Sequence, residues 1–213
     1  RMIALSQDQR LAYSLIFKNV GERAGASLEH THSQLIATPV VPLLIEDEMD
    51  RCKDFHGYGG HCLICDIIKQ ELREQERVVM DRRGFLVFTP YASRFPFEMW
   101  VLPKQHVSHF EHNTDELLDG LADVLHDTLT RLDMVLEGPA YNYMIHSCPT
   151  FFKRTGHYHW HIEIIPRVTR VAGFEWGTGF HINPVPPETA SEFLRDARES
   201  EEKGEEPVET HTG

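Results

Sequence analysis

The spacing of apolar residues along the chain predicts one long helix as its main element. Between Thr114 and Leu136, apolar residues recur mostly at intervals of three and four positions, the period of an amphipathic helix. Thr114 is a favourable N-cap residue, and Gly138 followed by Pro139 favours the end of a helix. This stretch is therefore predicted to be a long helix that crosses over between strands.

Shorter apolar patterns predict further elements on both sides of this helix. Helices are expected at residues 7–18, 46–54, 62–76 and 187–198. Strands are expected at residues 26–38, 77–80, 85–89, 98–102, 141–146 and 157–168, and the Gly- and Pro-rich residues 173–187 are expected to be irregular. Strand pairs joined by one long crossover helix indicate an α+β fold with a mostly antiparallel sheet.

Histidines alternate with large apolar residues in the last predicted strand. Successive side chains of an extended strand point to opposite faces, so His157, His159 and His161 are expected on one face. Tyr158 and Trp160 would lie on the other face. Such a strand is built either for chemistry or simply as a polar or metal-binding face of a sheet.

A shorter version of this pattern occurs near the start of the chain. Residues 29–34 read Glu-His-Thr-His-Ser-Gln, which places His30, His32 and Gln34 on one face of an extended strand. Two histidine strands in one chain suggest a duplicated unit.

Charge and composition narrow the classes of function. The chain has 213 residues and a net charge of −12, which argues against general binding to nucleic acid or to a membrane surface. It has no run of 18 apolar residues and no signal peptide, so a cytoplasmic protein is expected. Fourteen histidines make histidine chemistry the main hint in the composition.

The spacing of Cys62 and Cys65 is typical of a zinc site, since two thiolates need two further ligands to complete a tetrahedron. The candidates are His106, His109 and His157. We favour His106 and His157, which would make a closed structural site. The simpler alternative is a pair of buried free cysteines at the start of a helix.

His32 is the candidate nucleophile. A neutral imidazole attacks phosphorus well, and the phosphoramidate that forms is labile enough to pass its nucleotidyl group to an acceptor. Neutral hydrogen-bond donors around the phosphate oxygens would support this step, and Asn19, Ser27 and Gln34 could supply them. The alternative is that His30 and His32 bind a metal.

These residues resemble a known family. The pattern Asn19, Ser27, His30, His32 and Gln34 is similar to the active-site strand of the galactose-1-phosphate uridylyltransferase family, within the histidine-triad superfamily. The second histidine strand, with the Cys pair before it and Pro-Arg after it, resembles the C-terminal repeat of that family.

The resemblance implies a fold, a mechanism and partners. It implies a histidine-triad-like fold, zinc and a homodimer. It also implies a ping-pong reaction in which UDP-glucose uridylylates His32, glucose-1-phosphate leaves, and galactose-1-phosphate accepts the nucleotidyl group. Residues 173–179 resemble the sugar-recognition segment of the family, so Gly173, Phe174 and Glu175 are expected to bind substrate.

The sequence also departs from the family pattern. The His-x-His-Ser-Gln form, with Gly-Thr-Gly after residue 176, is closer to the ADP-glucose phosphorylase-like branch. The base, uracil or adenine, and the acceptor, galactose-1-phosphate or phosphate, therefore stay open. An alternative metal-ligand set in relatives would place its residues at Glu48, His146, His159 and His161.

Two other functions are compatible with the sequence. One is a histidine-triad nucleotide hydrolase in which His159 is the nucleophile. The other is a zinc-stabilised fragment without catalytic activity, because the first motif arrives by residue 30 and the first copy would be truncated. Residues 1–50 would then be the remnant of an N-terminal half with the catalytic strand, residues 51–198 the C-terminal half, and residues 199–213 a disordered acidic tail.

Overall fold

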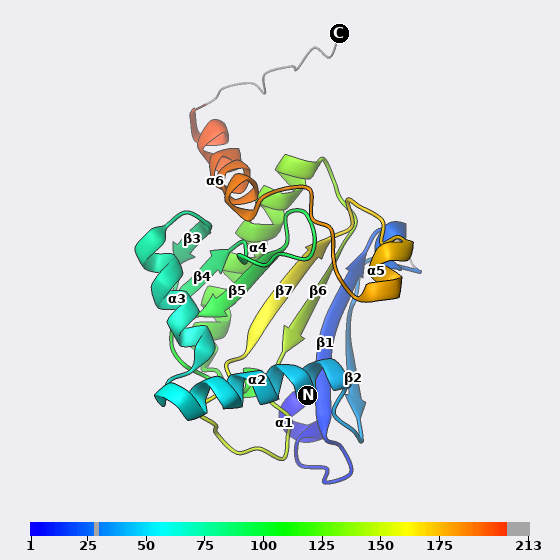
Figure 1. Cartoon of the computed structure of the whole chain (residues 1–213), viewed down its shortest axis with the longest axis vertical. Coiled ribbons are helices and arrows are strands. Elements are labelled where there is room, and N and C mark those ends of the chain that lie inside the picture. The colour runs from blue at the N-terminus through cyan, green and yellow to red at the C-terminus, as the bar shows by residue number, and fades with distance from the viewer. Residues whose placement is uncertain (28–29, 204–213) are drawn as a thin grey trace.

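A computed structural model describes residues 1–27 and 30–203 and shows a seven-stranded sheet in which every pair of neighbours is antiparallel (Figure 1). Its strand order is β2-β1-β6-β7-β5-β4-β3. The strands are β1 (Tyr13–Val20), β2 (Ser33–Thr38), β3 (Val78–Arg82), β4 (Phe85–Phe88), β5 (Met99–Pro103), β6 (Tyr141–His146) and β7 (His161–Pro166). The predicted α+β fold with an antiparallel sheet is confirmed.

Helices cover both faces of this sheet (Figure 1). The α-helices are α1 (Met2–Leu5), α2 (Leu43–Gly59), α3 (Leu63–Glu74), α4 (Asp115–Leu136), α5 (Gly173–Thr178) and α6 (Pro187–Lys203), and short 3-10 turns occur at η1 (Glu22–Ala24) and η2 (Phe110–His112). The long helix α4 begins as predicted, with the Thr114 hydroxyl accepting a hydrogen bond from the Leu117 amide (3.3 Å).

Alternation along the strands divides the core between the two faces. In β4, Phe85 and Val87 pack with residues of α4, whereas Leu86 and Phe88 pack with residues of α3. Helix α6 joins α4 on its face through Leu194. A third cluster lies where α2 packs against β1 and residue 158. Both faces of the central strands are therefore buried.

Three local predictions were wrong. Residues 7–18 were expected to be helical, but β1 begins at Tyr13 and lies between β2 and β6. The helix-like spacing of Leu15 and Ile16 arose because Leu15 packs with α2 and Ile16 packs with the α4 face, so apolar residues do not alternate. Residues 173–178 form α5 rather than an irregular segment.

The third concerns the tail that was predicted to be disordered from residue 199. Helix α6 continues to Lys203, and residues 204–213 lie outside the described part. The residues between 196 and 203 are rich in Glu, Arg and Lys, whose good helix propensity favours this extension of the helix.

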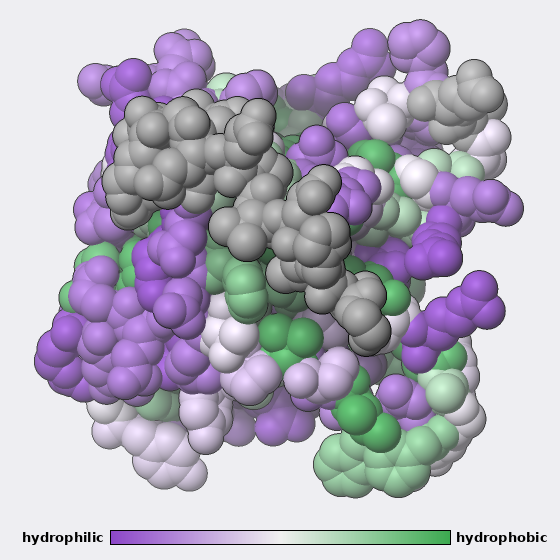
Figure 2. Space-filling model, turned by 90° about the horizontal axis from the view of Figure 1, so that it is seen from above, coloured by the Kyte–Doolittle hydropathy of each residue, from purple (hydrophilic) through white to green (hydrophobic). Residues whose placement is uncertain are grey.

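The surface seen from above is mostly hydrophilic, with hydrophobic residues gathered toward the lower edge of the view (Figure 2). Among the described residues, no helix combines the length and the apolar character that crossing a membrane requires.

We predict that Leu132→Ala lowers the free energy of unfolding by about 2–5 kcal/mol, because it leaves a cavity between α4 and the sheet. Leu132 is fully buried, whereas Leu118 on the same helix is 36% exposed. Leu118→Ala is therefore a matched control, expected to change stability by less than about 0.5 kcal/mol. Urea unfolding followed by circular dichroism measures both variants, and equal losses would contradict this packing.

Candidate metal centres and nucleophile

The polar residues of interest lie on the face of the sheet opposite α4. Tyr143 and Ile145 of β6 and Ile162 and Ile164 of β7 pack into the α4 core. Alternation therefore turns the intervening polar side chains toward the other face. These are Asn142, His146, His161 and Glu163.

The first cluster on this face contains Cys62, Cys65, His106 and His159, whose ligand atoms all lie within 4.8 Å of one another. Cys62 is the N-cap residue of α3, His106 follows β5, and His159 precedes β7. The predicted association of the Cys pair with His106 is thus present in the structure.

The fourth residue of this cluster is His159, not His157 as the sequence suggested. Strand β7 begins only at His161, so the strict alternation assumed for residues 157–161 does not hold across that stretch. The Nδ1 atom of His157 lies 2.6 Å from the Thr155 hydroxyl, and its ring faces His56. His109 is buried elsewhere, with its Nδ1 atom 2.8 Å from the Ser108 hydroxyl.

Hydrogen bonds to backbone carbonyls set the orientation of both rings in the first cluster. His106 donates from Nε2 to the Thr155 carbonyl (3.0 Å), and His159 donates from Nε2 to the Pro103 carbonyl (2.9 Å). Since a carbonyl only accepts, Nδ1 of each ring is unprotonated when the imidazole is neutral. The two Nδ1 atoms lie 3.3 and 3.5 Å from the Cys65 sulfur. This is the outer-partner arrangement typical of metal-binding histidines.

One thiol of the pair, Cys62, is prepared for deprotonation, whereas the hydrogen bond with Cys62 raises the pKa of Cys65. The hydrogen bond from Cys65 and the rings of His106 and His159 lower the pKa of Cys62 far below its ordinary value. The position of Cys62 at the N-terminus of α3 also favours a thiolate. Two thiolates and two imidazoles match a closed tetrahedral zinc site, which has no open position for a substrate.

A second cluster contains Glu48 of α2, His146 of β6 and His161 of β7. The Nδ1 atom of His146 lies 3.1 Å from a Glu48 oxygen, and Nε2 of His161 lies 3.6 Å from the other oxygen. His161 donates from Nδ1 to the His159 carbonyl (3.2 Å), which leaves its Nε2 unprotonated. The alternative ligand set from the sequence is therefore present apart from His159, which belongs to the first cluster.

The electrostatics of the second cluster favour a carboxylate between imidazoles. Burial alone would raise the pKa of Glu48, but the rings of His161 and His146 outweigh it and lower that pKa to about 2. Burial would lower the pKa of His146, but Glu48 and Glu163 outweigh it and raise that pKa. Burial lowers the pKa of His161, which favours the neutral form of its ring. Oxygen and neutral imidazole donors in this arrangement fit a divalent cation.

Glu163 links this cluster to a buried ion-pair network. One of its oxygens accepts a hydrogen bond from Arg94 (2.6 Å) and lies 3.8 Å from Nε2 of His146. Arg94 also pairs with Glu98 (3.2 Å). The arginine thereby fixes the carboxylate that faces the second cluster.

The candidate nucleophile His32 immediately precedes β2, because the strand predicted at residues 26–38 begins only at Ser33. It is exposed, and its Nδ1 atom donates to the His30 carbonyl (3.2 Å). Because a carbonyl only accepts, Nε2 of the neutral ring keeps its lone pair. Lys18 pairs with Ser33, and Phe17 pairs with Gln34.

The three predicted donors, Asn19, Ser27 and Gln34, differ in their position relative to His32. The ladder between β1 and β2 ends at the pair Lys18 and Ser33, so Asn19 is the next residue on β1 and His32 is the residue just before β2. Gln34 lies two residues after His32, within β2. Ser27 is exposed and adjoins residues 28 and 29, which lie outside the described part of the chain. Asn19 and Gln34 therefore both lie near the end of the ladder that His32 precedes.

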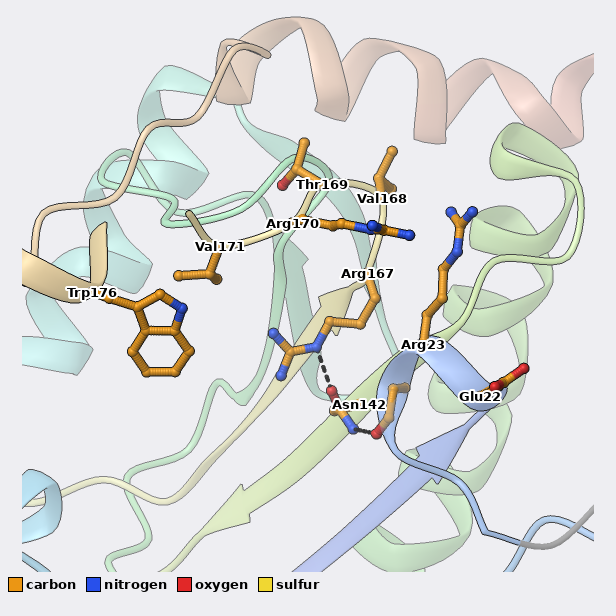
Figure 3. Close-up of a pocket in the computed structure, with 10 residues that line it drawn as sticks. Glu22, Arg23, Asn142, Arg167, Val168, Thr169, Arg170, Val171 and Trp176 are labelled. Carbon is orange, nitrogen blue, oxygen red and sulfur yellow. Dashed lines mark hydrogen bonds between the residues drawn. The ribbon is translucent and has the colours of Figure 1, made fainter. Parts of the chain in front are cut away.

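Asn19 belongs to a chain of amides that the sequence did not reveal. Asn142 donates from Nδ2 to Asn19 Oδ1 (2.8 Å) and to the Ala24 carbonyl (2.8 Å). Arg167 donates from Nε to Asn142 Oδ1 (2.6 Å; Figure 3). Asn142 and Arg167 were missed because their link to residue 19 depends on the pairing of β1 with β6, for which the sequence carries no local signal.

The segment predicted to bind sugar forms the short helix α5, which begins at Gly173. Phe174 is 55% exposed, and a carboxylate oxygen of Glu175 accepts a hydrogen bond from the Ala172 amide (2.9 Å). Trp176 lines a pocket shared with Arg167 and Asn142. Trp176 therefore places α5 at the pocket that Arg167 and Asn142 line.

We predict that His159→Asn weakens zinc binding by more than the roughly 10–100-fold that loss of an outer hydrogen-bond partner costs. His157→Asn is the matched control and is expected to keep its zinc, because that ring lies outside the cluster. Elemental analysis after dialysis against a graded chelator compares the two variants. Loss of zinc from His157→Asn alone would contradict the assignment.

Comparisons with known proteins agree with this architecture. The family model described as galactose-1-phosphate uridyl transferase, C-terminal domain, matches residues 48–196. An ADP-glucose phosphorylase from Arabidopsis thaliana is 37% identical over 198 residues, covering 92% of this chain and 55% of that protein. A galactose-1-phosphate uridylyltransferase from Thermotoga maritima is 32% identical over 200 residues, covering 90% of this chain and 62% of that protein.

Solved structures show the same similarity in three dimensions. The crystal structure of an ADP-glucose phosphorylase from Arabidopsis thaliana with bound ADP-glucose has a TM-score of 0.85 at 36% identity, over 92% of this chain and 62% of that one. A uridylyltransferase structure has a TM-score of 0.87 at 30% identity, over 93% of this chain and 64% of that one. The chain belongs to the galactose-1-phosphate uridyl transferase family, which it matches through the C-terminal domain of that family.

Proposed function

We propose that this chain is part of a nucleotidyltransferase that carries a nucleotidyl group on His32 and passes it between phosphate-containing substrates. One observation carries this proposal: the His30 carbonyl holds Nδ1 of His32 and leaves an exposed Nε2 lone pair at the end of the β1–β2 ladder, where Asn19 is the next residue of β1. A neutral imidazole in this tautomer is a suitable nucleophile toward phosphorus.

The proposed reaction has two displacement steps. Nε2 of His32 attacks the phosphorus next to the nucleoside, a P–N bond forms, and the P–O bond to the sugar phosphate breaks. A phosphate oxygen of the second substrate then attacks the same phosphorus. The P–N bond breaks, and the ring returns to its neutral form.

Neutral donors would stabilise the charge on the phosphate oxygens during both steps. The side chain of Asn19 accepts from Asn142 through Oδ1, so its amide nitrogen is left to donate. Gln34 lies in β2, just after His32 in the sequence, and Ser27 lies just before the histidine pair. We assign these three residues to the nucleotidyl phosphate.

The first cluster would hold zinc in a structural role. Zinc bound there would supply a cross-link between α3, the segment after β5 and the segment before β7. Cys62 and Cys65 hold one side of the site, and His106 and His159 hold the other. The carbonyl partners of the two rings keep the unprotonated nitrogens aimed at the centre.

We propose UDP-glucose–hexose-1-phosphate uridylyl transfer as the reaction, with Gly173, Phe174 and Glu175 on the sugar, and with a homodimer as the assembly. The family model and the uridylyltransferase relatives support this assignment. The Arabidopsis ADP-glucose phosphorylase, at 37% identity over 92% of this chain, favours ADP-glucose and phosphate as a second candidate pair.

The geometry opposes the alternative in which His159 is the nucleophile of a hydrolase. His159 is fully buried. Its Nε2 is used by the Pro103 carbonyl, and its Nδ1 faces the Cys65 sulfur. No lone pair of this ring remains for a substrate.

We predict that the protein retains label after incubation with UDP-glucose or ADP-glucose labelled at the phosphate next to the nucleoside. His32→Asn should abolish the label, because the attacking nitrogen is lost. His157→Asn, which changes a ring outside both clusters, should keep it. Measurement is by scintillation counting of denatured protein.

Two results would contradict this proposal. Equal label in His32→Asn would move the covalent step to another residue. Absence of label with either nucleotide sugar, together with bound zinc, would favour the catalytically incomplete, zinc-stabilised fragment.

A further inference from the structure

Arg167 is a half-buried cation whose side chain is held in place on two sides. It follows β7, its Nε donates to Asn142, and its guanidinium lies 5.4 Å from the ring centre of Phe95. Among the described residues, Arg167 forms no ion pair with a carboxylate, and neither of its terminal nitrogens has a hydrogen-bond partner. Two nitrogens of a pre-oriented guanidinium are thus available to a ligand.

These nitrogens face an open pocket of about 810 Å3 (Figure 3). Arg167 and Trp176 point toward each other across it. Arg23 and Arg170 also line it, and Glu22 is the one acidic residue in its lining. Three guanidinium groups against one carboxylate make the lining positively charged.

The electrostatic surroundings of Arg167 favour the binding of an anion. Burial and the neighbouring Arg94 lower the pKa of Arg167, although a guanidinium remains charged at neutral pH. A partly desolvated cation next to another cation is unfavourable unless a counter-ion compensates. Arg94 already has Glu98 and Glu163 as partners, so neither of these carboxylates serves Arg167.

Arg167 is also connected to Asn19 of β1 through the side chain of Asn142. The amide of Asn142 is fully used, since Oδ1 accepts from Arg167 while Nδ2 donates to Asn19 and to the Ala24 carbonyl. Only one orientation of this amide satisfies all three contacts. The position of Arg167 therefore sets the orientation of the Asn142 amide and, through it, of the hydrogen bond to Asn19, the residue of β1 just beyond the end of the β1–β2 ladder.

We propose that this pocket binds a phosphate dianion, either inorganic phosphate or the phosphate end of a sugar phosphate, through the terminal nitrogens of Arg167, and that Arg167 acts through Asn142 as a positioning residue for Asn19. This inference rests on the proposed function, in which that phosphate is the leaving group of the first step and the nucleophile of the second. Arg23 and Arg170 contribute charge at the pocket, and bidentate pairing explains the use of Arg167.

Binding is tested by calorimetric titration of the full chain with inorganic phosphate and, separately, with glucose-1-phosphate. Arg167→Gln should weaken binding by about 10-fold or more, the effect of losing charge-assisted hydrogen bonds. Arg170→Gln, an exposed position whose loss does not threaten folding, should weaken it by a smaller factor. Arg10→Gln, an exposed arginine paired with Asp8 outside the pocket, should leave binding unchanged.

The two titrations identify the source of the phosphate. Binding of both ligands assigns the pocket to phosphate groups in general, and binding of one alone assigns it to that source; either supports the proposal when it depends on Arg167. The proposal is overturned if neither ligand binds, or if the ligand that binds does so as tightly to Arg167→Gln as to the unaltered chain.

The positioning role is tested by the rate at which label reaches His32. Asn142→Ser keeps all three arginines, so phosphate should bind it within about 2-fold of the unaltered chain while labelling slows by about 10-fold or more. Arg167→Lys keeps the charge but loses the fork, and should recover part of the phosphate binding without recovering the labelling rate. Unchanged labelling in Asn142→Ser would remove the positioning role.

The experiments separate this inference from the proposed function. Phosphate binding does not require a reaction at His32, so Arg167-dependent binding without any label would overturn the proposed function alone. Label at His32 together with phosphate binding that ignores Arg167 would overturn this inference alone.

Discussion

The burial of two histidines in the middle of the sheet is the constraint on which the rest of the site depends. His159 and His161 are 0% and 1% exposed, so every ring nitrogen must find a partner inside the protein. Backbone carbonyls take one nitrogen of each ring. The other nitrogen must then face a thiol or a carboxylate, which brings α3 and α2 to the same face of the sheet.

The two ends of this face differ in what covers them. Helices α2 and α3 cover the end that carries the two candidate metal clusters, whose donor atoms come from several elements (Figure 1). The end near Asn19 and Asn142 opens into the arginine-lined pocket instead. A covered end that fixes the strands, beside an open end with an arginine-lined pocket, would give the chemistry proposed at His32 a rigid base.

Much of the fold follows from local pattern. The α4 helix with its Thr114 cap, the helix after Cys62 and the antiparallel strands could all be predicted, because periodicity and capping are local properties. The residues of β1 could not, since an inner strand with both faces buried loses its alternation. The prediction of His157 rather than His159 as the fourth residue of the cysteine cluster was also wrong, because the answer depends on where regular strand geometry begins.

The sequence by itself indicated the residues with candidate chemistry: the cysteine pair, the histidine-rich segments at 30–32 and 157–161, and Gln34. Only the tertiary structure decided which of them meet. Asn19 and Asn142 are 123 positions apart in sequence, and their hydrogen bond exists because β1 pairs with β6 in one register. Strand alternation is fixed by the geometry of each residue, whereas strand pairing is a long-range choice made by packing the whole core.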